Sequence, residues 1–423
     1  MEAEQSVFQH QYDNGLRLVA EPMPWLQSAA FSFRVPAGCQ YDPVDRRGVA
    51  NFACEMVQRG AGKRSSREFV EYLESLGVNY GSSVGIYHTN YGGAVPANRL
   101  FETLSTFADV IRRPTMPDDQ FEDGRLVCYQ EIQAIEDDLA QKTMIELRAR
   151  HFGDPVGRHC EGTMESVASI SMGDVQSFYD THYRPNDMIV AVAGNIEWEK
   201  LKDEIEDLFG DWESKPVPKV GLSPPQSGMH HIDFDSNQTH IALAWPCPSY
   251  EDPEYYLARC AIGVLSDGMS SRLFREVREK RGLCYTVFAS CSSVLNRGSV
   301  IGYCGTSAER AQESLDVMLA EINRLNEGVS ERELEKLKVQ FRSRLVMAQE
   351  SSRAMANNMA GDVFYLGRTR SIDEISRIIN EMTTSDINQF LARQPAHSFN
   401  IVTLGKHSLE LNDAVSTLSL IHI

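Results

Sequence analysis

The spacing of apolar residues in the first half of the chain switches between the periods of strands and helices. Residues 6–36 alternate apolar and polar side chains, and Asp13-Asn14-Gly15 is a hairpin turn signal within them. Apolar residues recur at helical spacing over 69–76 and again over 100–111. An unbroken apolar run over 188–193 predicts a buried strand. This half therefore predicts a sheet with helices packed on it.

The second half appears to repeat the first. The helix-like segment Asp174–Phe178 and the strand-like run that ends at Gly194 are echoed by Asp386–Phe390 and a run that ends at Gly405. Strands grouped before helices, with hairpins, favour an α+β fold over a doubly wound parallel sheet. We expect two structurally similar sandwich domains, each an antiparallel-rich sheet with helices packed on it, related as an internal repeat.

A proline-rich segment separates the two halves. Four prolines fall within residues 214–228, which is the composition of a linker. The predicted domains are therefore residues 1–213 and residues 229–423, with 214–228 as the linker between them.

Composition and charge narrow the classes of function. The 423 residues carry a formal net charge of −18, which argues against nucleic acid as a partner because phosphate binding depends on clustered Lys and Arg. No apolar run approaches the roughly 18 residues of a membrane span, and the N-terminus lacks the pattern of a signal peptide. The nine cysteines are an odd number without C-x-x-C spacing, which predicts reduced thiols. We expect a cytoplasmic protein.

Four motifs follow one another along nearly the whole chain: Gly48-x-x-x-Phe52, His88-Thr89-Asn90-Tyr91, Tyr183-Arg184-Pro185 and, most specifically, the run from Ser271 to Tyr285. Taken in order, they resemble the pitrilysin–insulinase family of metallopeptidases. The resemblance is to its short two-domain members, such as the mitochondrial processing peptidase subunits and their bacterial relatives.

The family's zinc motif is degenerate in this sequence. In H-x-x-E-H, two histidines bind zinc and the glutamate activates a water molecule. The corresponding positions here are Asn51, Cys54 and Glu55, and the family's third ligand corresponds to Glu131. Asn51, Glu55 and Glu131 are a poor set of zinc ligands, so we expect no metal and no cofactor bound by this chain.

Residues of these types also serve two other chemistries, oxygen-ligand metal binding and thiol catalysis. Paired carboxylates can hold Mg²⁺ or Ca²⁺ through oxygen ligands, although a solvated or hydrogen-bonded acidic cluster is the simpler interpretation. Cys54 has no neighbouring base or positive charge in the sequence to activate its thiol, and Glu55 would raise its pKa. We therefore interpret Cys54 as a buried, inert cysteine.

The resemblance implies that Arg278 and Tyr285 handle substrate. A guanidinium and a phenol can bind a peptide carbonyl or stabilise the negative charge that grows on it during hydrolysis. From the residues alone, the alternative is that Arg278 is one of several charges on an exposed helix and Tyr285 packs in a strand.

The resemblance also places His88, Thr89 and Tyr91 on an edge strand that binds extended peptides. Gly81-Ser82 stand where the family usually has Asn-Ala, which suggests weakened peptide binding on this domain.

The resulting hypothesis is a non-catalytic subunit of a heterodimeric zinc metallopeptidase. Its partner would be a homologous subunit that carries H-x-x-E-H and the zinc, while this chain supplies Arg278 and Tyr285 to the shared peptide substrate. We expect no peptidase activity from the chain alone. The alternatives are a structural or assembly protein of the same fold, and a homodimer that only binds peptides.

Overall fold

The computed structural model describes residues 6–294 and 296–411, which form two compact units. The first unit takes residues up to 134, 158–221 and 346–371, and the second takes 135–157, 222–345 and the chain from 372 onward. Each unit thus includes a segment from the other half of the sequence. The predicted domains, which were the contiguous ranges 1–213 and 229–423, do not include this exchange of segments. Residues 214–227 form neither helix nor strand, as expected for a linker.

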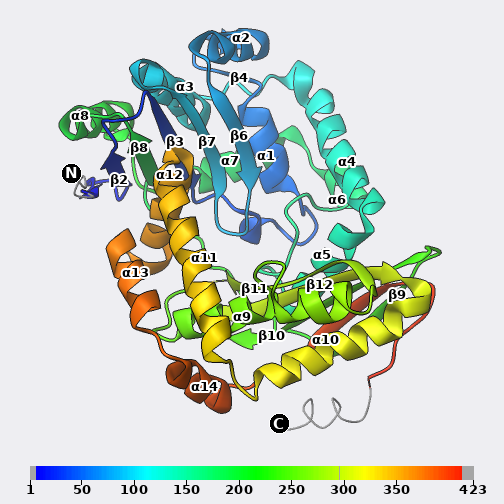
Figure 1. Ribbon diagram of the computed structural model, residues 1–423. Coiled ribbons are helices and arrows are strands. Elements are labelled where there is room, and N and C mark those ends of the chain that lie inside the picture. Colours follow the sequence, from blue (N-terminus) through cyan, green and yellow to red (C-terminus); the bar gives the residue numbers. More distant parts are fainter. Residues whose placement is uncertain (1–5, 295, 412–423) are drawn as a thin grey trace. The chain divides into compact units, whose positions relative to one another are not determined.

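The first unit contains a six-stranded sheet (Figure 1). All neighbouring strands are antiparallel except β2 and β8, which are parallel. In spatial order the strands are β1 (Phe8–Gln11), β2 (Arg17–Pro22), β8 (Ile189–Gly194), β3 (Ser28–Val35), β7 (Thr89–Pro96) and β6 (Asn79–Val84).

The second unit contains a five-stranded sheet with the same plan. Its order is β11 (Cys284–Val294), β12 (Arg297–Ser307), β10 (Gln238–Cys247), β13 (Asn400–Gly405) and β9 (Gly228–Asp233). Here too a single pair is parallel, β13 with β9. Read from the parallel pair outward, the order of connection matches that of the first sheet without β1. The predicted α+β fold and internal repeat are confirmed.

Helices pack on both sheets around two separate apolar cores. The helices that belong wholly or mainly to the first unit are α1 (Val49–Val57), α2 (Ser66–Leu76), α3 (Leu100–Arg112), α4 (Phe121–Asp137), α6 (Met164–Ser169), α7 (Met172–His182), α8 (Trp198–Phe209) and α12 (Ser352–Leu366). Those of the second are α5 (Leu139–Phe152), α9 (Tyr255–Ser266), α10 (Ala311–Leu325), α11 (Glu331–Gln349), α13 (Ile372–Glu381) and α14 (Thr384–Arg393). Shorter elements are the strands β4 (Gly60–Ala61) and β5 (Arg64–Ser65), the 3₁₀ turns η1 (Cys39–Tyr41), η2 (Ala97–Arg99), η3 (Asp118–Gln120) and η5 (Ala308–Arg310), and the π-helix η4 (Phe274–Glu279).

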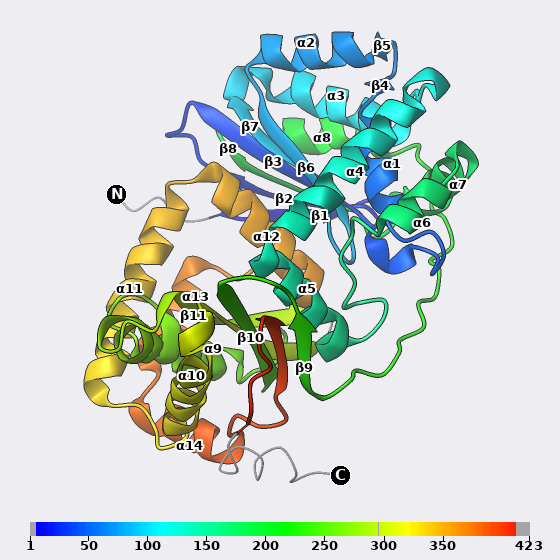
Figure 2. The ribbon, with the colours of Figure 1, turned by 90° about the vertical axis from the view of Figure 1, so that its right-hand side faces the viewer.

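Helix α12 is the segment of the second sequence half that belongs to the first unit, where it packs on β8 and β3 (Figure 2). Arg34 of β3 donates to the carbonyl of Asn357 at 3.0 Å, and Arg17 of β2 donates to the carbonyl of Val363 at 3.2 Å. Both arginines lie on the sheet, so the helix is fixed by charged side chains bonded to its backbone as well as by apolar contact.

Helix α5 makes the reciprocal exchange and packs on β13 and β10 of the second unit. His151, near its end, bridges two strands: Nε2 lies 2.7 Å from Ser299 Oγ and Nδ1 lies 2.8 Å from Asn400 Nδ2. Because the amide nitrogen of Asn400 can only donate, Nδ1 accepts and the imidazole is neutral. Burial lowers the pKa of His151 to about 4, which agrees with that state.

Within the described residues, no helix combines the length and the apolar character that crossing a bilayer requires.

Candidate functional site

Helix α1 carries three of the degenerate zinc-motif positions, and a buried carboxylate holds its start. Asp42 accepts hydrogen bonds from the backbone N–H groups of Gly48, at 2.7 Å, and Ala50, at 3.0 Å. Gly48 has φ of 93°, a left-handed conformation that favours glycine, and a Cβ there would lie 2.5 Å from the carbonyl oxygen of Glu161. Burial raises the pKa of Asp42 to about 7 in spite of these bonds. Asp42 and Gly48 thus set where α1 begins.

Two of the metal-ligand positions bind one another. Asn51 Nδ2, on α1, donates to Glu131 Oε2, on α4, at 2.6 Å. Burial raises the pKa of Glu131, and the Asn51 hydrogen bond partly offsets that effect. Glu55 faces a different partner, because its carboxylate forms an ion pair with Arg59 one turn later, at 2.8 Å.

Cys54 lies where the family motif has its catalytic glutamate, and it is 4% exposed. Burial raises the pKa of its thiol to about 12, while hydrogen bonds with Tyr91 and Ser82 lower it in part. A thiol with that pKa is protonated at neutral pH and is neither a nucleophile nor a general base. These contacts agree with the interpretation of Cys54 as buried and inert.

The side chains at these positions do not fit zinc. Structural and catalytic zinc sites use three or four Cys, His or carboxylate ligands around one point. Here one position is an amide that already donates to Glu131, and Glu55 is neutralised by Arg59. Across residues 6–294 and 296–411, no group of three or more His, Cys, Asp and Glu side chains is arranged to hold a metal ion.

The expectation that His88, Thr89 and Tyr91 lie on an edge strand is wrong. They precede or belong to β7, which pairs with β3 on one side and β6 on the other, so β6 forms the edge. Thr89 and Tyr91 are fully buried, and the hydroxyl of Tyr91 lies 2.7 Å from that of Tyr183.

His88 has a packing role in the same unit. Its ring meets Phe364 of α12 edge-on, with centroids 4.6 Å apart. Burial, followed by the charges of nearby arginines, lowers its pKa to about 3. A neutral imidazole under a covering helix is unavailable to a peptide on the sheet edge.

Arg278 and Tyr285 are brought together in the second unit. The guanidinium carbon of Arg278 lies 5.6 Å from the centre of the Tyr285 ring and 5.0 Å from that of Phe274. Tyr285 is 84% exposed and lines a cavity of about 460 Å³ together with residues of β12 and the Gly282 turn. Both side chains are therefore exposed side by side, with their donors open to solvent.

Two backbone irregularities create this arrangement. Arg278 lies in the π-helix η4, where the N–H of Lys280 bonds to the carbonyl of Arg275, five residues back, at 2.9 Å. Tyr285 falls at a shift of register between β11 and β12, so it is an unpaired bulge residue that turns outward. No residue pattern in the sequence announces either irregularity.

The structure also shows a charged residue that the sequence did not single out. Glu276, on the buried side of η4, bonds Lys280 at 2.8 Å and Arg281 at 3.1 Å, and it contacts Arg275 at 3.2 Å. The bond from Lys280 lowers the pKa of Glu276 to about 2, against an opposing effect of burial, with help from the two arginines. Glu276 thus gathers the surrounding cations and leaves Arg278 outside the cluster. The available signal was two acidic residues, Glu276 and Glu279, among five basic ones in 272–281, which does not single out Glu276.

Two family models match consecutive parts of the chain. The model described as "Insulinase (Peptidase family M16)" matches residues 17–164, and the one described as "Peptidase M16 inactive domain" matches residues 169–341. The chain belongs to the insulinase family, peptidase family M16. Its membership confirms the resemblance drawn from the motifs.

Relatives within the M16 family match over nearly their full length. A protein of Bacillus subtilis named an uncharacterized zinc protease is 28% identical over 389 residues, which is 90% of this chain and 93% of that protein. A Rickettsia bellii protein with a similar name is 26% identical over 94% of this chain and 97% of its own length.

Solved structures show the same fold. A crystal structure described as a peptidase M16 inactive domain, from Pseudomonas fluorescens, matches with a TM-score of 0.87 at 20% identity, over 96% of this chain and 99% of that one. A protease from Helicobacter pylori matches with a TM-score of 0.87 at 18% identity, over 95% of this chain and 99% of that one.

Proposed function

We propose that this M16 chain is the non-catalytic subunit of a heterodimeric zinc metallopeptidase. The observation that carries the proposal is a contrast between its two candidate sites. At the degenerate zinc motif, Asn51, Glu55 and Glu131 are engaged by protein partners, whereas Arg278 and Tyr285 stand exposed and held against each other. A homologous partner would supply H-x-x-E-H and the zinc.

The chemistry of the pair suits work on a peptide carbonyl. A guanidinium and a phenol are both donors, and donors that are already positioned stabilise the oxyanion of a tetrahedral intermediate without reorganising. Stacking against two rings restricts where the Arg278 guanidinium can go. The pair brings no nucleophile and no general base, so it completes a site on another chain and does not hydrolyse peptides by itself.

The names of relatives support a peptidase context. The proteins of Bacillus subtilis and Rickettsia bellii are called zinc proteases. A chain of this family without a zinc-fitting ligand set would contribute to proteolysis only by pairing with one that has it.

If peptide is held by strand addition on the first unit, β6 is the strand that would receive it. It forms one edge of the sheet, and space beside Gly81 is open for at least 4 Å from an added Cβ. Part of the edge is already engaged: Arg353 donates to the carbonyl of Asn79, and Gln58 donates to Ser82. This fits the weakened peptide binding expected from Gly81-Ser82.

The test is a peptidase assay with and without a homologous chain that carries H-x-x-E-H. We expect the isolated chain to be inactive and the pair to cleave a fluorogenic peptide. Arg278→Ala should lower kcat/KM of the pair by about 10²–10³-fold, the effect of losing one oxyanion donor. Tyr285→Phe, which removes only the hydroxyl, should lower it by about tenfold or more.

Arg67→Ala is the matched control, because Arg67 is also exposed but sits on α2 in an ion pair with Glu71. It should leave activity unchanged. Chelator-sensitive proteolysis by the isolated chain would refute the proposal. Full activity of the Arg278→Ala pair would instead favour a structural or assembly role for this subunit.

A further inference from the structure

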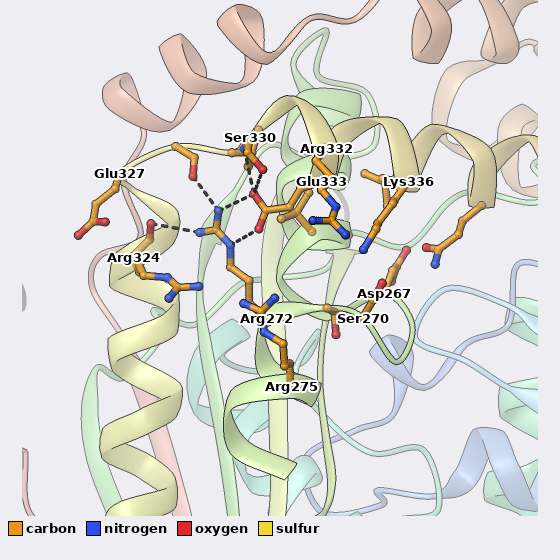
Figure 3. A pocket seen from close by; sticks show the side chains of 17 residues that line it. Asp267, Ser270, Arg272, Arg275, Arg324, Glu327, Ser330, Arg332, Glu333 and Lys336 are labelled. Carbon is orange, nitrogen blue, oxygen red and sulfur yellow. Dashed lines mark hydrogen bonds and ion pairs between the residues drawn. The ribbon is translucent and has the colours of Figure 1, made fainter. Parts of the chain in front are cut away.

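We propose that the second unit holds a binding site for a phosphate or pyrophosphate group. The site is a cavity of about 590 Å³ between the end of α9, the start of η4 and the connection from α10 to α11 (Figure 3). Five cationic side chains and three carboxylates line it, although the whole chain carries a net charge of −18. A locally positive cavity on an acidic protein concentrates anions.

One of these cations, Arg272, is part of the cavity wall, and its hydrogen-bond donors are already used by protein acceptors. Arg272 donates to both oxygens of Glu333, at 2.8 and 3.0 Å, and to the carbonyls of Arg324, at 3.2 Å, and Gly328, at 2.9 Å. Its side chain is 8% exposed. Figure 3 shows these bonds closing around the guanidinium. Arg272 therefore neutralises Glu333 and fixes the connection from α10 to α11 that borders the cavity.

The other lining carboxylates do not neutralise the remaining cations. Asp267 is already bound by Arg259, at 3.0 Å, and by Arg344, at 2.9 Å. Glu327 lies at the edge of the group, and Figure 3 shows it directed away from the cationic side chains.

Arg324 forms an ion pair with Glu321, at 3.0 Å, so three cations remain with charge to spare. Arg332 and Lys336 are one turn apart on α11, and neither forms an ion pair with any residue that the structure describes. Like charges at that spacing repel, so an anion between them removes a repulsion as well as adding an attraction. Arg275 shares its acidic partner, Glu276, with two other cations.

An independent observation points to a missing acceptor. Ser271 lines the same cavity and is 4% exposed, yet its hydroxyl is buried and has no hydrogen-bond partner among the described residues. An unsatisfied buried hydroxyl costs free energy, and native proteins rarely leave one. Because the hydroxyl oxygen has almost no accessible surface, an oxygen of a bound anion would accept this hydrogen bond only after the side chain turns toward the cavity.

The composition of the cavity selects the class of ligand. Arginine predominates among its cations, and the forked guanidinium matches the oxygens of phosphate better than an ammonium does. The volume is that of a small-molecule site. None of the described residues that line it is aromatic, so it offers no surface for stacking a base. The recognised part is therefore the phosphate or pyrophosphate group, whether inorganic or at the end of a larger metabolite.

Titration calorimetry of the full chain with inorganic pyrophosphate and with inorganic phosphate tests the site. We expect pyrophosphate to bind at least as tightly as phosphate, with affinity that falls as salt increases. Arg332→Gln with Lys336→Gln should weaken binding at least tenfold. Both positions are exposed, and glutamine keeps helix propensity, so the fold should be retained. Ser271→Ala should weaken binding about threefold, as loss of one hydrogen bond predicts.

The control variant is Lys219→Gln with Arg377→Gln, which removes the same charge at exposed positions that form no ion pair within the described chain. It should bind within twofold of the unaltered protein. Three results would each overturn the proposal. They are equal pyrophosphate affinity of the Arg332/Lys336 variant and the control, no pyrophosphate binding at millimolar concentration, and tighter binding of a hexaglutamate peptide than of pyrophosphate. The measurement needs no partner subunit, so its outcome is independent of the peptidase hypothesis.

Discussion

Replacing Arg272 by Met should destabilise the second unit by about 3 kcal/mol at neutral pH. The substitution keeps the apolar stem but removes four donated hydrogen bonds, two to Glu333 and two to backbone carbonyls. Losing one partner of a fully buried ion pair costs about 3–5 kcal/mol. Glu333 is 29% exposed and keeps hydrogen bonds from the backbone and hydroxyl of Ser330, which places the expected loss at the lower end.

The loss should also depend on pH in a defined direction. Burial alone would raise the pKa of Glu333, but hydrogen bonds from Arg272 and Ser330 outweigh it and lower the pKa to about 2. A carboxyl with a depressed folded-state pKa contributes stability above its unfolded pKa of about 4.3, and that contribution is lost as pH falls toward 2. The difference between the variant and the unaltered protein should therefore be largest near pH 7 and smaller at pH 3.5.

Urea unfolding followed by tryptophan fluorescence measures this difference; of the four tryptophans, the buried Trp245 belongs to the second unit and the other three to the first. Arg278→Met is the matched control. Arg278 lies in the same segment as Arg272, but it is exposed and bonds to no carboxylate among the described residues. It should change the free energy of unfolding by about 0.5 kcal/mol or less. An Arg272→Met effect below about 1 kcal/mol, or one that does not shrink on acidification, would refute this account of the pair.

Three further outcomes follow from the first unit. Phe52→Ala should cost about 3–5 kcal/mol in urea unfolding, because Phe52 is fully buried and stacks on Phe121 with ring centres 4.7 Å apart. Cys54, with its pKa raised to about 12 by burial, should resist iodoacetamide at pH 8 in the native protein and react only after unfolding, as peptide mass spectrometry would show. The imidazole of His88, with its pKa lowered to about 3, should stay neutral from pH 8 to pH 5 in NMR titration. Because the unfolded pKa is about 6.5, keeping His88 neutral contributes stability above that pH, and this contribution is lost as pH falls toward 3.

The features that the sequence predicted correctly have local causes. The predicted turn at Asp13-Asn14-Gly15 joins β1 to β2. The helix predicted over 69–76 is α2, and the capping box of Ser65 and Glu68 at its start is equally local. At the start of α11, the Glu333 carboxylate accepts hydrogen bonds from the backbone N–H and the hydroxyl of Ser330. Each of these depends on residues within four positions of one another, so a linear pattern is sufficient to reveal it.

The features that were missed depend on distant partners. Nothing in the periodicity of 352–366 says that α12 packs on the sheet of the first unit, because amphipathic spacing shows that a helix has a buried face but not what covers it. The error over His88 has the same origin: β6 pairs with β7 on its outer side, and Phe364 of α12 lies on the His88 ring. The π-helix that carries Arg278 likewise has no residue signature, since it differs from an α-helix by one residue in a turn.

The two candidate sites differ in how much their residues contribute to the stability of the fold. This difference helps to explain why Arg278 and Tyr285 are present. Asn51 and Glu131 join α1 to α4 by an amide–carboxylate hydrogen bond, so the contact between these helices needs no ion. An exposed cation–π pair, in contrast, contributes only about 0.5–1 kcal/mol, and Tyr285 with 84% of its surface in solvent buries little apolar area. Stability therefore accounts for the first pair and not for the second. Two exposed donors stand at a π-helix and a β-bulge, both irregularities that weaken regular hydrogen bonding, and this supports the proposal that the two residues contact a ligand.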